Sequence, residues 1–258
     1  MDCRTALSPS RLPGLDLALN PYRGCEHRCA YCYAQDVTRF ATDRPWGDTV
    51  EVRANIVARL KTELVRGVSG VCGIGTVTDP YQPAEEEYEL TRGCVAVLRR
   101  FDARISILTK SDLVLRDLDL LRSWPSAEVG VTVSCIDERI SSVLEPGAPS
   151  PRRRFEAMAR LSSEGVDCYL MAAPVIPGVS DSEELLAGMV SEAKGAGVGR
   201  VMWDMYNPKP IAHSRLMGAL ERSGIRPGPS ASPGRASDVR RVLARECTAS
   251  GIQLTDAF

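Results

Sequence analysis

The chain has 258 residues, of which 44% are hydrophobic, 25% charged and 5% aromatic. Its 32 basic and 33 acidic side chains leave a formal net charge of −1. This composition excludes a disordered tail, a fibre and a collagen-like repeat, and it argues against a strongly basic protein that coats nucleic acid, while allowing a local basic patch.

Short apolar runs rich in β-branched residues alternate with helical patterns along the chain. Strands are expected over residues 16–20, 71–78, 104–109, 129–134, 166–173 and 198–204. Helices are expected over 53–66, 85–100, 112–123, 151–164, 180–196, 211–223 and 236–250. Ser180 stands in capping-box spacing to Glu183, and the Pro-, Gly- and Ser-rich segment 225–234 predicts a loop.

Six strand–helix repeats predict parallel βαβ units, and therefore an α/β protein. In 129–134 the valines would face the helices, and Gly130, Thr132 and Ser134 would face the interior. Because six units are too few for a complete eight-unit barrel, we predict a partial (β/α)6 TIM-type barrel with parallel strands. One domain would span 1–258, with a core over about 15–210 and a C-terminal helical extension over about 211–258.

The chain contains nine cysteines, no apolar run long enough to span a membrane, and no signal-peptide core near its first residue. We therefore expect a cytoplasmic protein with no membrane partner, whose cysteines are free, metal-bound or catalytic rather than disulfide-bonded. Cys25, Cys29 and Cys32 form a C-x3-C-x2-C pattern within residues 20–34, NPYRGCEHRCAYCYA.

Three thiolates on one short loop can bind three corners of a [4Fe–4S] cluster, whereas four thiolates would saturate it. The missing fourth ligand leaves one iron open, as catalytic metal sites require. The alternative is a non-catalytic module, in which His27 completes a Cys3His zinc site or a cluster serves only structure. A methyltransferase that moves the methyl group of S-adenosylmethionine by ordinary polar transfer is disfavoured, because the chain lacks a Gly-rich first loop.

The cysteine spacing, the aromatic Tyr31 before the third cysteine and the repeated β–α pattern resemble the radical S-adenosylmethionine (SAM) superfamily. The flanking residues and TDPYQPAE at 78–85 resemble its spore photoproduct lyase-like branch, also labelled DNA repair photolyase-like, over roughly residues 3–210. The resemblance implies a [4Fe–4S] cluster that cleaves SAM reductively to methionine and a 5′-deoxyadenosyl radical, which abstracts hydrogen from a substrate. It also implies a low-potential electron donor such as a flavodoxin or ferredoxin.

The resemblance also implies cofactor contacts at the carboxyl ends of the strands. Tyr31 would contact the adenine through its backbone, and Lys110, one of four lysines, would hold the SAM carboxylate. The other implied contacts are Thr78 and Asp79 to the amino group, Ser134 to the ribose and Ala173 to the adenine edge. Each of these positions has an alternative interpretation. Asp79 would belong to an ordinary turn at 79–80, and Lys110 would be an exposed lysine. Ser134 and Ala173 would serve only the packing of small residues.

The residue that would return hydrogen to the product radical is open. Spore photoproduct lyase has a donor cysteine near the end of strand two, but the matching residues here, 76–78, contain none, which argues against thymine-dimer cleavage. The candidates are Cys135, Tyr81 and Tyr206. The substrate would sit in the mouth of the barrel, at the carboxyl ends of its strands, lined by the two tyrosines with Met171 and Asp204. Both a nucleic acid or nucleotide and a small metabolite or peptide stay open as substrate. The run 152–154, three arginines, is expected to be a solvated face.

Overall fold

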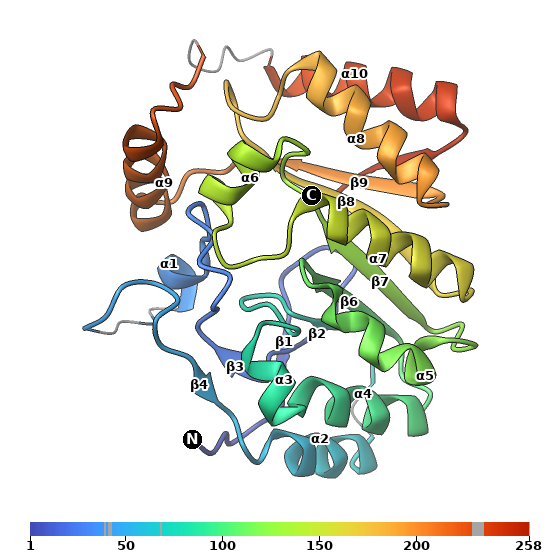
Figure 1. Ribbon diagram of the computed structural model, residues 1–258. Helices are drawn as coiled ribbons and strands as arrows, with labels where there is room; N and C mark the ends of the chain where they lie inside the picture. The colour runs from blue at the N-terminus through green and yellow to red at the C-terminus, as the bar shows by residue number, and fades with distance from the viewer. Residues whose placement is uncertain (39, 41–42, 68, 229–234, 258) are drawn as a thin grey trace.

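The computed structural model describes residues 1–38, 40, 43–67, 69–228 and 235–257. Its central element is a sheet in the order β1–β2–β5–β6–β7–β8–β9–β10 (Figure 1). All neighbouring pairs in this sheet are parallel except β1 with β2. The strands are Leu7–Pro9 (β1), Leu17–Leu19 (β2), Cys72–Ile74 (β5), Ile105–Thr109 (β6), Ala127–Thr132 (β7), Asp167–Val175 (β8), Arg200–Met205 (β9) and Gln253–Asp256 (β10).

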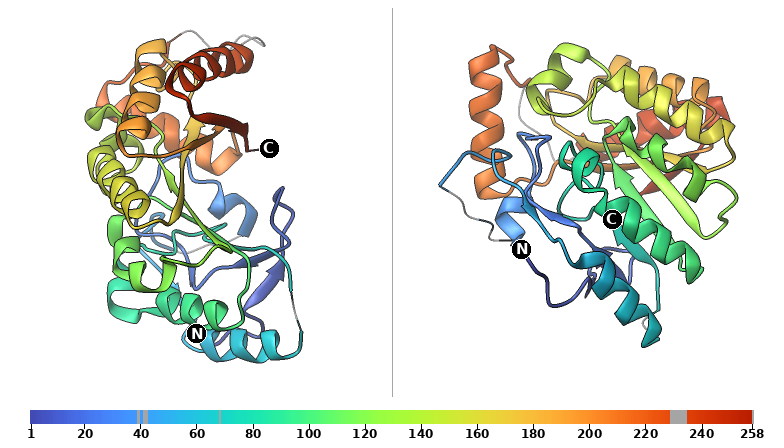
Figure 2. Two further views of the ribbon diagram at one scale, coloured as in Figure 1. Left: turned by 90° about the vertical axis from the view of Figure 1, so that its right-hand side faces the viewer. Right: turned by 60° about the horizontal axis from the view of Figure 1, so that its bottom comes forward.

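The sheet curves, and helices cover its convex side (Figure 2). The helices are Ala34–Thr38 (α1), Ile56–Val65 (α2), Ala84–Tyr88 (α3), Leu90–Arg100 (α4), Leu118–Leu121 (α5), Glu138–Leu144 (α6), Pro151–Ser163 (α7), Glu183–Gly195 (α8), Pro210–Ser223 (α9) and Arg235–Ser250 (α10), with a 3-10 helix at Asp112–Asp117 (η1). The predicted α/β class with a mostly parallel, partial barrel is confirmed.

The alternation along β7 places the two faces of the sheet as the sequence predicts. Val129 and Val131 are completely buried in the core between sheet and helices. On the inner face, Tyr169 and Met171 of β8 form a separate apolar group with residues of β6 and β9. Gly130 faces Tyr169, and a Cβ on it would lie 2.4 Å from that ring. The tyrosine ring therefore fills the space above Gly130 on the inner face of the sheet.

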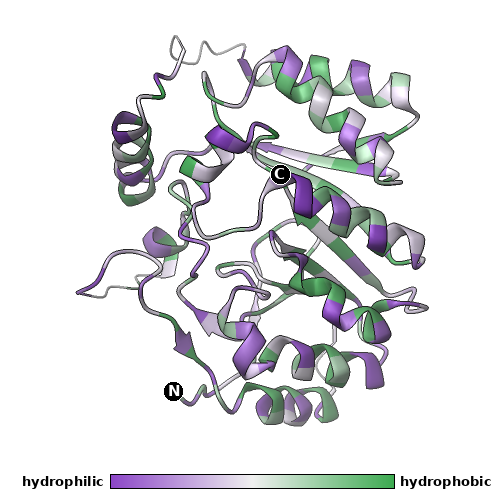
Figure 3. Cartoon of the chain, in the orientation of Figure 1, coloured by the Kyte–Doolittle hydropathy of each residue, from purple (hydrophilic) through white to green (hydrophobic). Residues whose placement is uncertain are grey.

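The amphipathic helices follow the same logic. In α8, Leu186, Met189, Val190 and Ala193 recur at helical spacing and are completely buried. Figure 3 shows hydrophilic residues interspersed with hydrophobic ones along the covering helices, as expected where one side of a helix meets water. Within the described ranges, no helix has both the length and the apolar character that crossing a bilayer requires.

Two strands of the large sheet were not expected from the sequence. β1 pairs antiparallel with β2, and β10 pairs parallel with β9, so the segment after 211 is not purely helical. The residues of β10 are half-buried or exposed and mostly polar, so no apolar pattern marks it as a strand. Its pairing with β9 forms it, helped by the Trp203 indole, which donates to the Asp256 carboxylate at 2.6 Å. A small separate sheet joins β3 (Tyr22–Arg23) and β4 (Glu51–Val52).

Several predicted boundaries were wrong for local backbone reasons. The strand expected over 71–78 ends at Ile74, because Gly75 turns the chain with a φ of +91°. The helix expected over 85–100 divides at Glu89, whose φ is +47°. Ser182 rather than Ser180 caps α8 by accepting the Leu185 amide. Residues 225–228 of the predicted 225–234 loop carry no helix or strand, and 229–234 lie outside the described residues.

Candidate functional site

The three cysteines of the C-x3-C-x2-C pattern lie on the loop between β3 and α1, above the carboxyl ends of the parallel strands (Figure 1). Two successive turns form it: the Arg28 amide donates to the Cys25 carbonyl at 3.2 Å, and the Cys32 amide to the Cys29 carbonyl at 3.2 Å. Gly24, its first residue, has a φ of +90°, and a Cβ there would lie 2.4 Å from the Thr49 carbonyl oxygen. We call residues 24–33 the cysteine loop.

The thiols of this loop suit a group that brings positive charge. Burial raises the pKa of Cys25 well above its usual range, that of Cys29 to about 12, and that of Cys32. Lys110 acts against these shifts at Cys29 and Cys32. A metal that binds here must therefore displace protons from buried thiols, and cationic side chains help to stabilise the thiolates it creates.

A single zinc ion and an iron–sulfur cluster make different demands on the placement of three thiols. A tetrahedral zinc with bonds of about 2.3 Å needs its sulfur ligands about 3.8 Å apart. Among the described residues, no three His, Cys, Asp or Glu side chains converge as ligands of one metal ion. Thiolates that each bind a different iron of a cluster do not need such convergence.

Gln82 and Thr78 hold the cysteine loop on both sides of Cys25. The Gln82 side-chain oxygen accepts the Glu26 amide at 2.9 Å, and its nitrogen donates to the Gly24 carbonyl at 3.3 Å and to the Thr78 hydroxyl oxygen at 2.9 Å. The Thr78 hydroxyl itself donates to the Gly24 carbonyl at 2.6 Å. Both side chains are buried and fully used by these bonds.

Asp79 joins the cysteine loop to the ends of β5 and β6. Its carboxylate accepts the Thr109 hydroxyl and the Lys110 amide, each at 2.7 Å, and the Tyr81 amide at 2.9 Å. His27 of the cysteine loop places Nδ1 3.2 Å from the same carboxylate. Burial disfavours the charged form, but His27 and these donors outweigh it and lower the pKa of Asp79 to about 2.

A second buried carboxylate, Glu145, lies under the other end of the loop. It forms an ion pair of 2.5 Å with Arg154, and both side chains have 0% exposure. It also accepts the Tyr31 and Ser134 hydroxyls. Burial disfavours ionisation of Glu145, but Arg154 and then Lys110 outweigh it and lower its pKa. The expectation of three solvated arginines at 152–154 was therefore wrong at Arg154.

Lys110 lies beside the cysteine loop, as the sequence predicts for a residue at the end of β6. Its ammonium is 5.6 Å from the centre of the Tyr31 ring. Burial works against its charge, but the Cys29 thiol and Glu145 outweigh it and raise the pKa of Lys110. The ammonium thus stays charged next to the thiols, where an anionic group could approach it.

Helix α9 reaches the cysteine loop from the C-terminal part of the chain. The Arg215 guanidinium donates to the Cys32 carbonyl at 2.6 Å, to the Ala30 carbonyl at 3.1 Å and to the Gln35 side chain at 2.9 Å. Asp36 of α1 accepts the first amides of α9 at 3.0 and 3.1 Å. An apolar pocket of about 620 Å³ between α9 and Trp46 borders Arg215.

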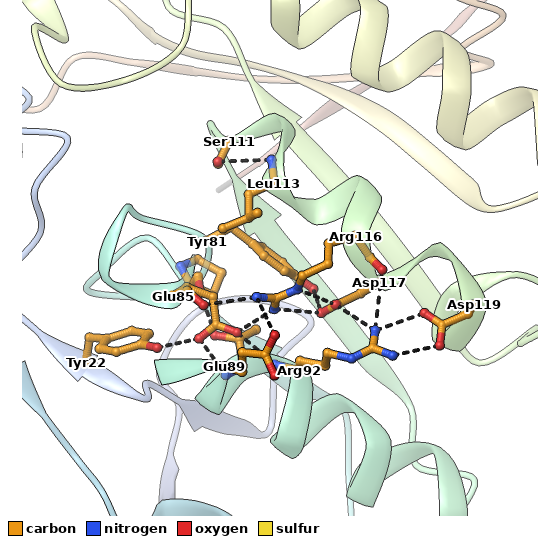
Figure 4. Close-up of polar contacts among 12 residues, drawn as sticks. Tyr22, Tyr81, Glu85, Glu89, Arg92, Ser111, Leu113, Arg116, Asp117 and Asp119 are labelled. Atoms are coloured by element: carbon orange, nitrogen blue, oxygen red, sulfur yellow. Dashed lines mark hydrogen bonds and ion pairs between the residues drawn. The ribbon is translucent and has the colours of Figure 1, made fainter. Parts of the chain in front are cut away.

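Tyr81 does not reach the mouth. It is buried, and its hydroxyl donates to Asp117 at 3.0 Å within a polar network under α3 and η1 (Figure 4). Arg116 bridges Asp117 and the completely buried Glu85 at 2.9 and 2.6 Å, and Glu85 also accepts the Tyr22 hydroxyl. This network fixes the start of α3, and with it the turn that carries Thr78, Asp79 and Gln82.

The remaining candidate residues differ in how deeply their side chains are buried. Ser134 is completely buried and donates its hydroxyl to Glu145, so its oxygen can still accept a hydrogen bond but no longer donate one. Cys135 is also completely buried, and burial raises its pKa to about 11, so it does not open to the mouth. Ala173 lies on the inner face near Met171, next to a cis bond to Pro174. Half-buried Asp204 has its pKa raised by burial.

Tyr206 is the tyrosine that lies beside the cysteine loop. It packs in the apolar group that contains Tyr31 and Cys29. Its ring stacks on His213 with centres 6.2 Å apart and an angle of 25°. Its hydroxyl is buried and finds no hydrogen-bond partner in the part of the chain that the structure describes.

Comparison with known proteins identifies related chains and a matching family. The model of the Radical SAM superfamily matches residues 19–189. An uncharacterized protein of Methanocaldococcus jannaschii is 35% identical over 182 residues, which are 70% of this chain and 68% of that protein. An uncharacterized protein of Mycobacterium tuberculosis is 34% identical over 207 residues, and the match spans 76% of this chain but only 61% of the mycobacterial protein.

Among solved structures, a spore photoproduct lyase variant with bound AdoMet and dinucleoside spore photoproduct superposes with a TM-score of 0.75. The match covers 98% of this chain and 80% of that one, at 15% identity. This similarity shows a shared fold, and the fold extends through the segment after 211.

Proposed function

Because this chain belongs to the radical SAM superfamily, we propose that Cys25, Cys29 and Cys32 bind three irons of its [4Fe–4S] cluster and leave the fourth iron open to SAM. When bound, the reduced cluster supplies the electron that splits SAM into methionine and a 5′-deoxyadenosyl radical. The observation that carries the proposal is the group of three thiols, with Cys25 and Cys29 buried and Cys32 half-buried, on one loop at the carboxyl ends of the strands. Parallel α/β proteins keep their reactive sites at this edge.

We assign the contacts to SAM to polar groups of the site that are not already hydrogen-bonded within the protein. Lys110 presents a charged ammonium beside the cysteine loop and is our candidate for the SAM carboxylate. The side chains of Thr78 and Asp79 are already bonded, so in our proposal they position the turn whose backbone carbonyls receive the SAM ammonium. Ala173, on the inner face at the end of β8, is the candidate for the adenine edge.

The substrate would enter the inner face next to this SAM site. Asp204 and Met202 of β9 lie on that side, so a molecule that presents hydrogen-bond donors to a carboxylate fits the position. A nucleobase and a small metabolite or peptide both meet this requirement. Tyr206 is our candidate for returning hydrogen to the product radical, because it packs beside the cysteine loop and its hydroxyl has no hydrogen-bond partner among the described residues. The enzyme also requires a reductant, and we propose a flavodoxin or ferredoxin.

The test is anaerobic reconstitution with iron and sulfide, followed by SAM and dithionite and measurement of 5′-deoxyadenosine. We expect the product from the wild type and from Cys247→Ala, which removes a buried thiol on α10. We expect none from Cys25→Ala, because one iron then lacks its thiolate. Tight zinc binding with no cluster in the wild type would contradict the proposal.

The same assay addresses the substrate class. Addition of dinucleotides or short DNA, compared with pools of peptides or metabolites, should raise the yield of 5′-deoxyadenosine for the correct class. We expect Asp204→Asn to lower that stimulation while leaving the yield without substrate unchanged, because Asp204 is assigned to the substrate side. Equal stimulation of Asp204→Asn and the wild type would remove Asp204 from the site.

A further inference from the structure

Arg215 connects the C-terminal part of the chain to the cysteine loop. It lies outside residues 19–189, which the family model matches, yet it donates to the backbone carbonyls of Ala30 and Cys32. Its third bond, to Gln35, extends the contact to the start of α1. One side chain therefore holds three positions around the last cysteine, two on the cysteine loop and one just beyond it.

The position of Arg215 is itself fixed from two directions. Its guanidinium carbon lies 5.4 Å from the centre of the Trp46 ring, which supports it by a cation–π contact. Asp36 accepts the amides of Ile211 and Ala212, so the beginning of α9 is attached to α1. Because α1 begins just after the cysteine loop, these hydrogen bonds attach the start of α9 to the loop and hold Arg215 beside it.

The charge of Arg215 bears on the thiolates that the loop presents. The guanidinium interacts electrostatically with Cys32 and Cys29. A fixed cation near a cluster stabilises the reduced form, which carries one more negative charge, and cluster potentials respond to such charges and to hydrogen bonding around the ligands. Arginine suits this place because its planar fork bonds several carbonyls at once while keeping its charge.

We propose that Arg215 is a positioning residue of the cluster, which holds the backbone around Cys32 and raises the potential at which the cluster accepts one electron from its reductant. This inference rests on the proposed function, since it requires a cluster on the cysteine loop. It assigns to α9 a role in the redox chemistry: the C-terminal part of the chain completes the cluster environment.

The test compares cluster-loaded variants by iron content after gel filtration and by redox titration followed with electron paramagnetic resonance. Arg215→Gln removes the charge and most of the fork. We expect the one-electron reduction equilibrium to move about tenfold toward the oxidised form, which corresponds to about 59 mV. Arg222→Gln is the matched control, because it removes the same charge from the exposed last turn of the same helix.

Arg215→Lys separates the charge from the hydrogen bonds. It should keep a potential close to that of the wild type but retain less iron, because an ammonium cannot bond all three acceptors in the same geometry. If Arg215→Gln does not fold, as judged by circular dichroism, this variant decides the question: full iron retention would overturn the positioning role.

The outcomes separate this inference from the proposed function. If the wild type itself binds no cluster, the proposed function fails. If the wild type binds a cluster but Arg215→Gln retains full iron and titrates with the same potential as Arg222→Gln, the role of Arg215 is refuted while the cluster assignment stands.

Discussion

The buried pair of Glu145 and Arg154 allows a stability prediction with a built-in control. In Arg154→Leu, Glu145 keeps its burial but loses a partner at 2.5 Å. Arg154 also donates to the Thr132 carbonyl at 3.1 Å and to the Pro149 carbonyl at 2.8 Å, so β7 and the segment before α7 lose contacts as well. Removing one partner of a buried ion pair costs about 3–5 kcal/mol, and we expect a loss in this range.

Arg152→Leu is the control, because it changes the same residue type on the same helix. Arg152 is 75% exposed and pairs with Glu156 one turn along at 3.3 Å. Such exposed pairs contribute about 0.3–0.5 kcal/mol. The two substitutions should therefore differ about tenfold in their effect on the free energy of unfolding, although the residues are two positions apart.

Urea titrations of the cluster-free chain, followed by circular dichroism, measure both values. The double variant Glu145→Gln with Arg154→Leu should lose less than the sum of its single variants, because no buried charge is then left unpaired. The pKa of Glu145 is lowered in the native chain, so the stability that this pair contributes is present above about pH 4.3, the ordinary value for glutamate, and is lost as pH falls below it. A loss for Arg154→Leu no larger than for Arg152→Leu would refute the reasoning.

Two further predictions concern the turn that supports Cys25. Gln82→Leu removes the hydrogen bonds to Gly24 and Glu26 on either side of Cys25. This variant should therefore retain less iron after gel filtration than Gln82→Glu, which keeps an acceptor for the Glu26 amide. Equal iron retention would speak against a role of Gln82 in holding the cysteine loop. Asp79, with a pKa of about 2 against about 3.9 when unfolded, should contribute about 2.6 kcal/mol of stability above about pH 5 that is lost progressively as pH falls toward 2. In urea titrations the difference between wild type and Asp79→Asn should shrink through that window, and a constant difference would contradict the assignment.

Tertiary contacts changed the interpretation of the segment 78–85 in particular. TDPYQPAE at 78–85 suggests residues that touch SAM, but in the structure the polar side chains of Thr78, Asp79 and Gln82 are bonded to the protein around Cys25. Gln82 belongs to this segment, but the segment gives no sign of the partner of Gln82, because Gln82 and the Gly24 carbonyl are far apart in the chain. The carboxylates Glu85 and Asp117 carry no local signal of burial at all.

The sequence alone predicts those features of this protein that depend on residues close together in the chain. The three cysteines are a few residues apart, so their loop and its capacity for a cluster with an open iron are set by nearest-neighbour spacing. The alternation of valine with small residues in 129–134 likewise determines which side of the strand faces the helices, because side chains alternate along every strand.

Only the tertiary structure decided the contacts between distant segments. Arg152, Arg153 and Arg154 are chemically identical, but Arg154 lies on the buried face of α7, where its partner Glu145 comes from another segment, and the other two are exposed. β10 exists because β9 offers it hydrogen bonds, and Arg215 reaches Cys32 because α9 docks on α1. Such contacts depend on the relative placement of whole elements, which the packing of the complete core determines and local sequence does not encode.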